Sequence, residues 1–188
     1  MTPRIAIFVR GGVVQEVASD TAHVLIKLLD MDSIEDPEGL PGHLIVEAHS
    51  PDKDATDLQL ALDRIALDSP TRVVVVGGAG GRVDHELATA SLLCAERYSA
   101  IDEIDWLSGR ASCHVIRRRR TLHADIGTLI SLLPVNGDAH GVTTTGLQWV
   151  LEDATIESGS TRGVSNLFTS PAADIQLTGG VLLAVIPR

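Results

Sequence analysis

The sequence predicts an α/β domain with a mostly parallel sheet, followed by an all-β sandwich domain. Up to about residue 115, apolar strand-like runs alternate with segments of helical period, which is typical of an α/β layer built on parallel strands. From residue 125 onward no helical period persists, and short strand-like segments are separated by Gly, Pro, Asn and Ser, which favours an antiparallel sandwich or barrel. We therefore expect one domain at residues 1–118 and a second at 119–188.

The first half contains the elements of such an α/β layer. Strands are predicted at residues 4–9, 43–48, 72–76, 103–107 and 112–116. The run RVVVV at 72–76 has the continuous apolar character of a fully buried parallel strand. A helix is predicted over 56–67, with Thr56 or Asp57 as its N-cap. Its apolar positions at helical spacing are Leu58, Ala61, Leu62 and Ile65. A second amphipathic helix is predicted over 84–98, capped by Asp84.

The second half is made of shorter strand-like pieces. They lie at residues 128–135, 146–153, 154–160, 173–178 and 180–188. Between the two halves stands a basic run, Arg117 to Arg120. We interpret this run as a solvated strand end or linker rather than a phosphate-binding patch.

Composition argues against several classes of function. The net charge of −10 repels the backbones of nucleic acids, so no nucleic-acid partner is expected. No apolar run approaches the ~18 residues that a membrane span needs, and no signal peptide opens the sequence, so no membrane partner is expected. The only cysteines, Cys94 and Cys113, lie in apolar stretches without the spacing of a metal site. A reduced, cytoplasmic protein is the simplest interpretation.

Acidic residues follow the predicted strands of the first half, at the point where each apolar run ends. They are Asp30 and Asp32, then Asp52, Asp54 and Asp57, and finally Asp84. Because ligands of an open parallel sheet bind beyond the carboxyl ends of its strands, we expect these carboxylates to converge on one edge. Such a concentration of negative charge requires a cation, and hard oxygen ligands favour Mg²⁺.

A glycine-rich loop, GGAGGR at residues 77–82, follows the strand at 72–76. Its glycines allow close backbone approach to an anion, and Arg82 supplies a planar cationic fork suited to phosphate oxygens. Together with the acids, the loop favours a phosphoryl-transfer site, which works by positioning and charge neutralisation. Each signal also has an ordinary structural interpretation: Asp54 or Thr56 would cap the first helix, and His85 would form a hydrogen bond in the first turn of the second.

Six sequence motifs together resemble the thiamin pyrophosphokinase family, in the family's order and at about its spacing. They are DMDSI, PDKDATD, GGRVDHELA, SLLP, GVTTTGLQW and GVSN, and the resemblance covers residues 28–188. It implies an α/β domain followed by a β-sandwich, and a homodimer. The implied reaction transfers a pyrophosphoryl group from ATP to the hydroxyl of thiamin, giving thiamin diphosphate and AMP.

The resemblance also implies a role for each motif residue. The catalytic residues would be Asp30, Asp32, Asp54, Asp57 and Asp84, of which Asp30, Asp32 and Asp54 would hold Mg²⁺. The nucleotide would be bound by Gly80, Gly81, Arg82, Asp84 and His85. Thiamin would be bound by Ser33, Asp52, Trp149, Ser165 and Asn166. A tryptophan face suits the flat pyrimidine and the cationic thiazolium of thiamin, by stacking and by cation–π attraction. The family places this tryptophan against the acids of the partner subunit, so that two chains share each active site.

The first 28 residues depart from the family's pattern. Arg10 stands where the family carries the aspartate of its DGGA motif, and Leu29 replaces the glycine of its GDFDS motif. These residues either form a divergent start of the family's fold or are an unrelated segment joined to it. Two other functions therefore stay open: a catalytically impaired nucleotide- or thiamin-binding homologue, and a related diphosphotransferase or nucleotide hydrolase that acts on another alcohol or on water.

Overall fold

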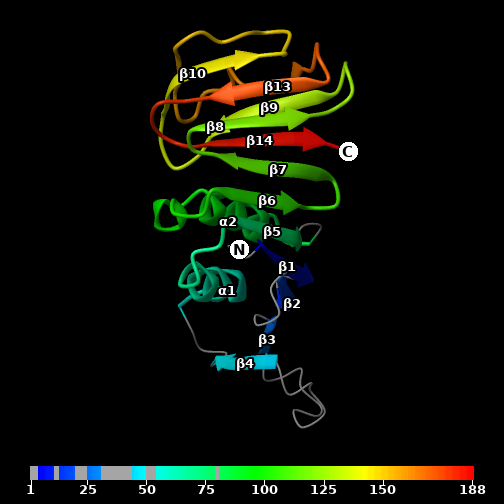
Figure 1. Cartoon of the computed structure of the whole chain (residues 1–188), viewed down its shortest axis with the longest axis vertical. Coiled ribbons are helices and arrows are strands. Elements are labelled where there is room, and N and C mark those ends of the chain that lie inside the picture. Colours follow the sequence, from blue (N-terminus) through cyan, green and yellow to red (C-terminus); the bar gives the residue numbers. More distant parts are fainter. Residues whose placement is uncertain (1–3, 11–12, 20–24, 31–43, 50–53, 79–80) are drawn as a thin grey trace. The chain divides into compact units, whose positions relative to one another are not determined.

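The computed structural model describes residues 54–78 and 81–188 in full, and the strand backbones at 4–10, 13–19, 25–30 and 44–49. The chain divides into two compact units, one formed by residues 1–89 and 100–109 and the other by 90–99 and 110–188. Strands dominate and helices are few, as Figure 1 shows, which confirms the coarse prediction of a sheet-rich chain. The predicted division at residues 118 and 119 concerns functional domains and stays a prediction.

Three parallel strands lie side by side in the first unit. They are β1 (Arg4–Arg10), β5 (Arg72–Gly77) and β6 (Glu103–Leu107), in the order β6-β5-β1. Val9 pairs with Gly77 and Val76 pairs with Leu107, so the carboxyl ends of all three strands lie at the same edge. The glycine-rich loop begins at this edge, because its first residue, Gly77, is the last residue of β5.

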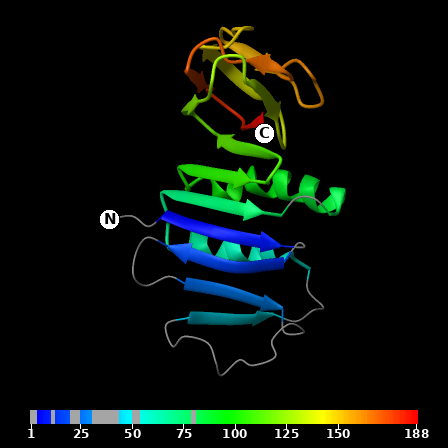
Figure 2. The same ribbon diagram turned by 90° about the vertical axis from the view of Figure 1, so that its right-hand side faces the viewer.

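The strand β2 (Val13–Ser19) runs antiparallel to β1 and was not predicted. Its sequence, VVQEVAS, lacks a clear alternation of apolar and polar residues. Pairing with β1 therefore determines this strand more than its own pattern does, as is common for strands. Next to β2 lies β3 (Leu25–Asp30), which pairs in parallel with β4 (Leu44–His49). In Figure 2 the arrows of β1, β3, β4, β5 and β6 point the same way and that of β2 points back.

The strand β5 is only half buried, which corrects the prediction of a fully buried strand. Val73 and Val75 are completely buried, whereas Val74 and Val76 are partly exposed. Successive side chains of a strand point to opposite faces, so one face of β5 packs in the core and the other is less covered. Arg72 ties β5 to β6, because its Nη2 donates to Oδ2 of the buried Asp105 at 2.7 Å.

The helix α1 (Asp57–Ala66) confirms the first helix prediction. Thr56 is the N-cap, and its Oγ1 accepts a hydrogen bond from the backbone N–H of Gln59 at 3.3 Å. This bond satisfies one of the otherwise free donors of the first turn. The four predicted apolar positions, Leu58, Ala61, Leu62 and Ile65, are all buried.

The second helix begins and ends at other residues than the sequence predicted. The helix α2 spans Val83–Leu93, so Asp84 lies inside its first turn and is not the N-cap. Its chain then turns into a short 3-10 helix, η3 (Glu96–Tyr98), instead of continuing to residue 98. The break occurs at Ala95, whose backbone is extended (φ −64°, ψ 142°). Within the described residues, no helix is long and apolar enough to cross a membrane.

Two sets of four antiparallel strands make up most of the second unit; we call them its first and second sheets, and the first is one part of a longer sheet. The first has the order β12 (Asn166–Leu167), β9 (Leu129–Pro134), β14 (Leu182–Pro187) and β7 (Ala111–Ile116). The second has the order β11 (Ala154–Ile156), β10 (Ala139–Thr145), β13 (Ala172–Gln176) and β8 (Arg119–His123). One hydrophobic core joins them, with Ile130, Leu132 and Ala184 from the first sheet and Val142 and Ile175 from the second.

Residues 146–153 form an irregular loop, which corrects the strand predicted there. Two residues of the loop adopt left-handed conformations, Gly146 with φ +75° and Asp153 with φ +44°. A Cβ at Gly146 would lie 2.2 Å from the carbonyl oxygen of Ala172, so a side chain is excluded there. The strand predicted at 154–160 is likewise shorter, since β11 ends at Ile156.

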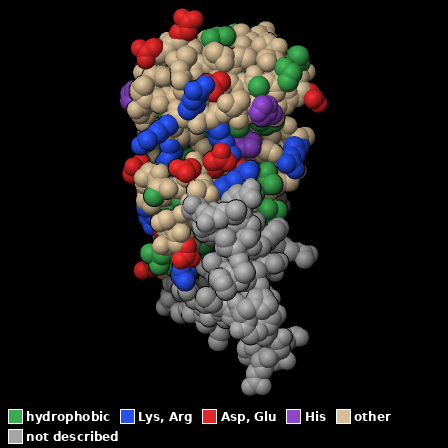
Figure 3. Space-filling model, viewed as in Figure 1, with side chains coloured by type: hydrophobic (Ala, Val, Ile, Leu, Met, Phe, Trp, Pro, Cys, Tyr) green, Lys and Arg blue, Asp and Glu red, His purple; other side chains and the backbone are tan. Residues whose placement is uncertain are grey.

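The basic run 117–120 is more than a solvated strand end. Arg117 donates through Nη2 to the carbonyl oxygens of Leu93 and Ala95, at 3.2 and 2.9 Å, and through Nη1 to that of Cys94 at 3.3 Å. These carbonyls follow the last turn of α2, where intrahelical donors are lacking. Burial lowers the pKa of Arg117, opposed by nearby Cys94 and Glu96. On the face drawn in Figure 3, basic side chains lie among acidic ones over the described surface.

We expect Arg117→Ala to lower the free energy of unfolding by about 1.5–3 kcal/mol, because three carbonyl oxygens lose a charged donor. Chemical denaturation measures this change. Arg118→Ala is the matched control, because Arg118 is exposed and adjacent, and it should change stability by no more than about 0.5 kcal/mol. Equal effects of the two variants would contradict a specific role for Arg117.

Candidate functional site

The predicted acidic edge is described only in part. Asp30 is the last residue of β3 and pairs with His49, the last residue of β4, so its backbone lies at the carboxyl edge of these strands. Asp32, Ser33, Asp52 and Gly80 lie outside the described residues. Among the residues that the structure does describe, no group of three His, Cys, Asp or Glu side chains could hold a metal ion. The predicted metal ligands therefore stay a prediction.

Two further acids of the predicted set flank the start of α1. Asp54 is exposed, and Asp57 is the first residue of the helix and partly buried. Both are carboxylates, which are the donor type that Mg²⁺ prefers. Thr56 between them serves as the cap, so of the three caps that the sequence left open, Asp54, Thr56 and Asp57, the structure confirms Thr56. The cap is thus a hydroxyl group rather than one of the two carboxylates.

The glycine-rich loop starts from a fixed point. Gly77 and Gly78 have φ values of 88° and 74°, in the left-handed region that favours glycine. The indole Nε1 of Trp106 donates to the carbonyl oxygen of Gly77 at 2.7 Å, which anchors the end of β5. At Gly81, no atom lies within 4 Å of the position that a Cβ would take. The backbone of Gly81 is thus open to an approaching group.

Arg82 and Asp84 form an ion pair at the surface. The Nε of Arg82 donates to Oδ1 of Asp84 at 3.2 Å, and its Nη2 donates to Oδ2. The side chains are 71% and 62% exposed, so both are accessible to a ligand. The hydrogen bond from Arg82 lowers the pKa of Asp84, and the same bond raises the pKa of Arg82. His85, which follows them, is partly buried.

We expect Arg82→Gln to raise the pKa of Asp84 toward the ordinary carboxyl value, since the dominant cause of its depression is removed. In the unchanged protein Asp84 should therefore stay ionised to a lower pH than in the variant. Carboxyl carbon-13 NMR titration measures this directly. Arg118→Gln removes an exposed arginine elsewhere and should leave the pKa of Asp84 unchanged. An equal shift of this pKa in Arg118→Gln, or no shift in Arg82→Gln, would contradict the pairing of Arg82 with Asp84.

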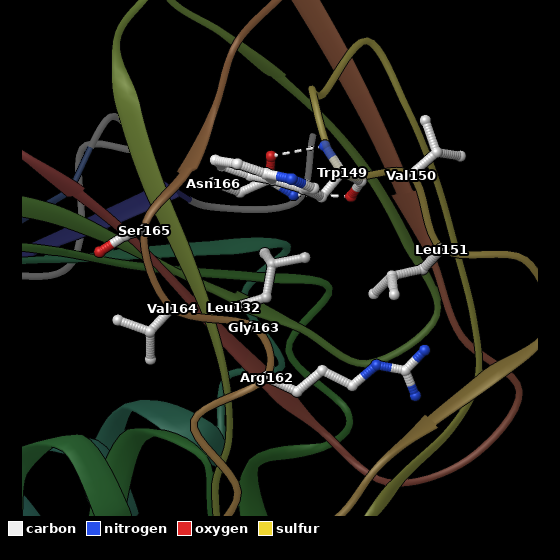
Figure 4. Close-up of a pocket in the computed structure, with 9 residues that line it drawn as sticks. All are labelled: Leu132, Trp149, Val150, Leu151, Arg162, Gly163, Val164, Ser165 and Asn166. Atoms are coloured by element: carbon white, nitrogen blue, oxygen red, sulfur yellow. Dashed lines mark hydrogen bonds between the residues drawn. The ribbon is translucent and has the colours of Figure 1, made fainter.

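A pocket of about 540 Å³ lies in the second unit, within the range typical of small-molecule sites. Figure 4 shows its lining, which comes from β9, the loop 146–153, the turn 162–165 and the start of β12. The lining residues are Leu132, Trp149, Val150, Leu151, Arg162, Gly163, Val164, Ser165 and Asn166. Three of these, Trp149, Ser165 and Asn166, were predicted as binding residues.

Trp149 is exposed rather than part of the core. Its exposed fraction is 56%, whereas Trp106 is 6% exposed. A tryptophan in a sandwich domain is commonly a core residue, but Trp149 is not. An exposed aromatic ring on a pocket wall offers a stacking surface for a flat ligand.

The turn that carries Ser165 and Asn166 is fixed against β9. A Cβ at Gly163 would lie 2.1 Å from the carbonyl oxygen of Leu132, so only glycine allows this approach. The carbonyl of Gly163 accepts a hydrogen bond from the N–H of Leu132 at 2.8 Å, and the N–H of Ser165 donates to Oγ of Ser131 at 3.1 Å. Asn166 is almost completely buried. The turn thus presents the hydroxyl-bearing residue Ser165 at the surface and keeps Asn166 inside.

Sequence reasoning missed the rest of the pocket. Val150 and Val164 are large apolar residues that stay about half exposed, at 52% and 44%. Arg162 reaches along the pocket wall, as Figure 4 shows, and its Nη1 donates to the carbonyl oxygen of Thr155 at 3.4 Å. In the sequence, the only indication that Val150, Arg162 and Val164 line a pocket is that they lie in or next to the GVSN and GLQW motifs. Their exposure, however, depends on how the loop and the turn pack, which periodicity does not reveal.

Comparison with known proteins accounts for both parts of the candidate site. Residues 28–102 match a family model described as "Thiamin pyrophosphokinase, catalytic domain", and residues 113–182 match one described as "Thiamin pyrophosphokinase, vitamin B1 binding domain". The chain belongs to the thiamin pyrophosphokinase family. The Arg82–Asp84 pair lies in the first matched segment and the pocket in the second.

Individual members of the family are similar over most of this chain. Thiamine pyrophosphokinase 1 of Oryza sativa subsp. japonica is 30% identical over 157 residues, which cover 73% of this chain and 56% of the relative. The Bacillus subtilis (strain 168) enzyme is 28% identical over 149 residues, covering 74% and 66%. This chain spans 56% and 60% of two rice relatives, thus less than two thirds of their length.

Solved structures of the family share the fold. The crystal structure of thiamine pyrophosphokinase from Bacillus subtilis superposes with a TM-score of 0.73 at 26% identity, covering 87% of this chain and 78% of that one. Thiamin pyrophosphokinase from Geobacillus thermodenitrificans gives a TM-score of 0.65 at 25% identity, covering 77% and 66%.

Proposed function

We propose that this chain carries the activity of its family and transfers a pyrophosphoryl group from ATP to thiamin. The supporting observation is that both of the family's domains match in one chain, with the GGRVDH segment in the first and an exposed tryptophan on a pocket in the second. The hydroxyl oxygen of thiamin attacks the β-phosphorus of ATP, and the bond between that phosphorus and the α-phosphate oxygen breaks. The products are thiamin diphosphate, AMP and a proton.

In this proposal residues 1–118 form the α/β domain that binds nucleotide and metal. Arg82 and the glycine-rich loop hold phosphate oxygens, with His85 beside them and the amides at the start of α2 adding positive potential. Arg82 exchanges its bond with Asp84 for a bond with phosphate, which is possible because the pair is exposed. Asp30, Asp32 and Asp54 would hold Mg²⁺, which neutralises phosphate charge in such reactions. Asp57 and Asp84 complete the acidic set.

Residues 119–188 form, in the same proposal, the all-β sandwich domain that binds thiamin. Trp149 stacks on the ligand, and Ser165 and Asn166 line the same pocket. Ser33 and Asp52 belong to the thiamin side as well, by the family's motifs. Arg162 adds a positive charge to the pocket wall, so the cationic thiazolium should lie away from it and toward the acids. A cytoplasmic setting belongs to the proposal, supported by two buried free cysteines, Cys94 and Cys113.

A second function is favoured by one feature of the first unit. Arg10 ends β1, one residue beyond the pair of Val9 with Gly77, so an arginine stands at the edge where the glycine-rich loop begins. A base in place of the family's acid weakens metal binding at that edge. The alternative is therefore a catalytically impaired homologue that still binds nucleotide or thiamin.

AMP release from ATP tests the proposal, and it should require both thiamin and Mg²⁺.

Asp84→Asn should keep the fold, because the side chain is exposed, and should lower turnover by about 100-fold, since one charge at the phosphate site is lost. Glu157→Gln, an exposed acid of the second unit, is the control and should retain activity. Retained thiamin binding without AMP release would favour the impaired homologue, ADP release would favour a different phosphoryl transfer, and an undiminished rate in Asp84→Asn would exclude its assigned role.

We infer further that the active site is shared across a homodimer, with Trp149 of one chain facing the acids of the other. Asp32→Asn and Trp149→Ala should each be nearly inactive. About half of randomly formed dimers combine the two, and each mixed dimer holds one intact site and one doubly altered site. Co-expression in equal amounts should therefore restore roughly a quarter of the activity. No recovery, or a monomer at micromolar concentration, would contradict a shared site.

A further inference from the structure

The side chain of Asn166 is committed to the protein's own backbone. Its Oδ1 accepts hydrogen bonds from the N–H of Trp149 at 3.0 Å and from the N–H of Leu167 at 2.8 Å. Its Nδ2 donates to the carbonyl oxygen of Trp149 at 2.8 Å. With 7% exposure, the amide has little surface left for a ligand. One side chain therefore holds both main-chain groups of the exposed tryptophan.

The loop around Trp149 is tied down on both sides. Before it, the N–H of Gln148 donates to the carbonyl of Leu167 at 2.9 Å. After it, Leu151 exchanges hydrogen bonds with Thr144, whose Oγ1 accepts from the N–H of Leu151 at 3.0 Å and whose N–H donates to the carbonyl of Leu151 at 2.9 Å. Between these anchors, Asn166 fixes the tryptophan's own backbone. Figure 4 shows the indole and the amide lying together at one end of the pocket.

We propose that Asn166 is a positioning residue that holds the ring of Trp149 in place as a binding surface, and that it acts on the ligand through Trp149 rather than by touching it. This inference rests on the proposed function for the identity of the ligand, thiamin. A ring that is fixed before binding loses less freedom when the ligand arrives, and affinity gains accordingly. The neighbouring Ser165, whose side chain is exposed, is left as the polar contact from this turn.

Fluorine NMR of protein labelled with 5-fluorotryptophan reports on Trp149 directly. The chain has two tryptophans, so two resonances are expected, and Trp149→Phe assigns them. Asn166→Ala should shift or broaden the Trp149 resonance before any ligand is added. The Trp106 resonance should stay unchanged, because that ring is buried in the first unit and bonded to Gly77.

Thiamin affinity, measured by calorimetry, should fall about 3- to 10-fold in Asn166→Ala, the range expected for losing a preorganised aromatic side chain. The KM for thiamin should rise by a similar factor, with kcat and the KM for ATP little changed. If Asn166→Ala does not fold, Asn166→Asp serves instead. It keeps both acceptor bonds and loses the donor to Trp149, so intermediate changes are expected.

Two variants separate positioning from contact and from general stability. Ser165→Ala should weaken thiamin binding without moving the Trp149 resonance. Asn136→Ala removes an asparagine that also makes two side-chain hydrogen bonds, to Ser91 at 2.7 and 2.9 Å, but lies outside the pocket lining. It should leave both the resonance and thiamin affinity unchanged, whatever its effect on stability.

The outcomes distinguish this inference from the proposed function. If the unchanged protein binds no thiamin and releases no AMP, the proposed function fails, while the ligand-free resonance still tests the hold of Asn166 on Trp149. If thiamin binds and Asn166→Ala changes neither the resonance nor the affinity, the positioning role is overturned. A loss of affinity with an unmoved ligand-free resonance would show direct contact and would overturn it as well.

Discussion

Parallel pairing of β5 with β1 and β6 is the constraint on which the first unit depends. Parallel neighbours in register end at the same edge, so the last residues of three strands and the beginning of the glycine-rich loop lie together. Two polar contacts hold this arrangement: Arg72 neutralises the buried Asp105 across β5 and β6, and Trp106 anchors the carbonyl of Gly77. A buried carboxylate without its partner would be strongly unfavourable, so the first contact also enforces the order of the strands.

In the second unit, most of the pocket lining lies on a loop and a turn rather than on strands. Neither segment has a repeating backbone hydrogen-bond pattern, yet their polar groups need partners wherever they are buried. Side chains supply them: Thr144 holds Leu151, Ser131 holds Ser165, and Asn166 holds Trp149. The rigid sheets thereby position an exposed aromatic ring that no strand carries.

The start of the chain is where this protein differs from its family's motifs. The strand β2 pairs antiparallel with β1, and β1 ends at the same edge as β5, where the glycine-rich loop begins. Arg10 is the last residue of β1, so a basic residue stands at the end of a strand in a half of the sequence where acids follow other strand ends. Under the proposed function, a positive charge there would compete with a metal ion for the carboxylates or would add to phosphate binding. The first effect would favour the impaired homologue and the second the active transferase.

The sequence by itself determined the family and those secondary-structure elements that depend on neighbouring residues in the chain. The helix α1 was predictable because its cap and its four buried residues stand at helical spacing. The motifs around Asp84, Trp149 and Asn166 likewise pointed to the segments where an exposed ion pair and a pocket occur. The metal-binding role of Asp30, Asp32 and Asp54 rests on their position after apolar runs and on the motif resemblance, and it stays a prediction.

Only the tertiary structure decided the features that depend on distant partners. The strand β2 exists because β1 pairs with it, and α2 ends at Leu93, with Arg117 bonded to the carbonyls at and after that end. The segment 146–153 is a loop because Gly146 packs against the carbonyl of Ala172. The hydrogen bonds of the Asn166 side chain to the backbone of Trp149 likewise join residues distant in the chain. Hydrogen bonds between residues far apart in the chain leave no period in the sequence, so residue patterns could not show them.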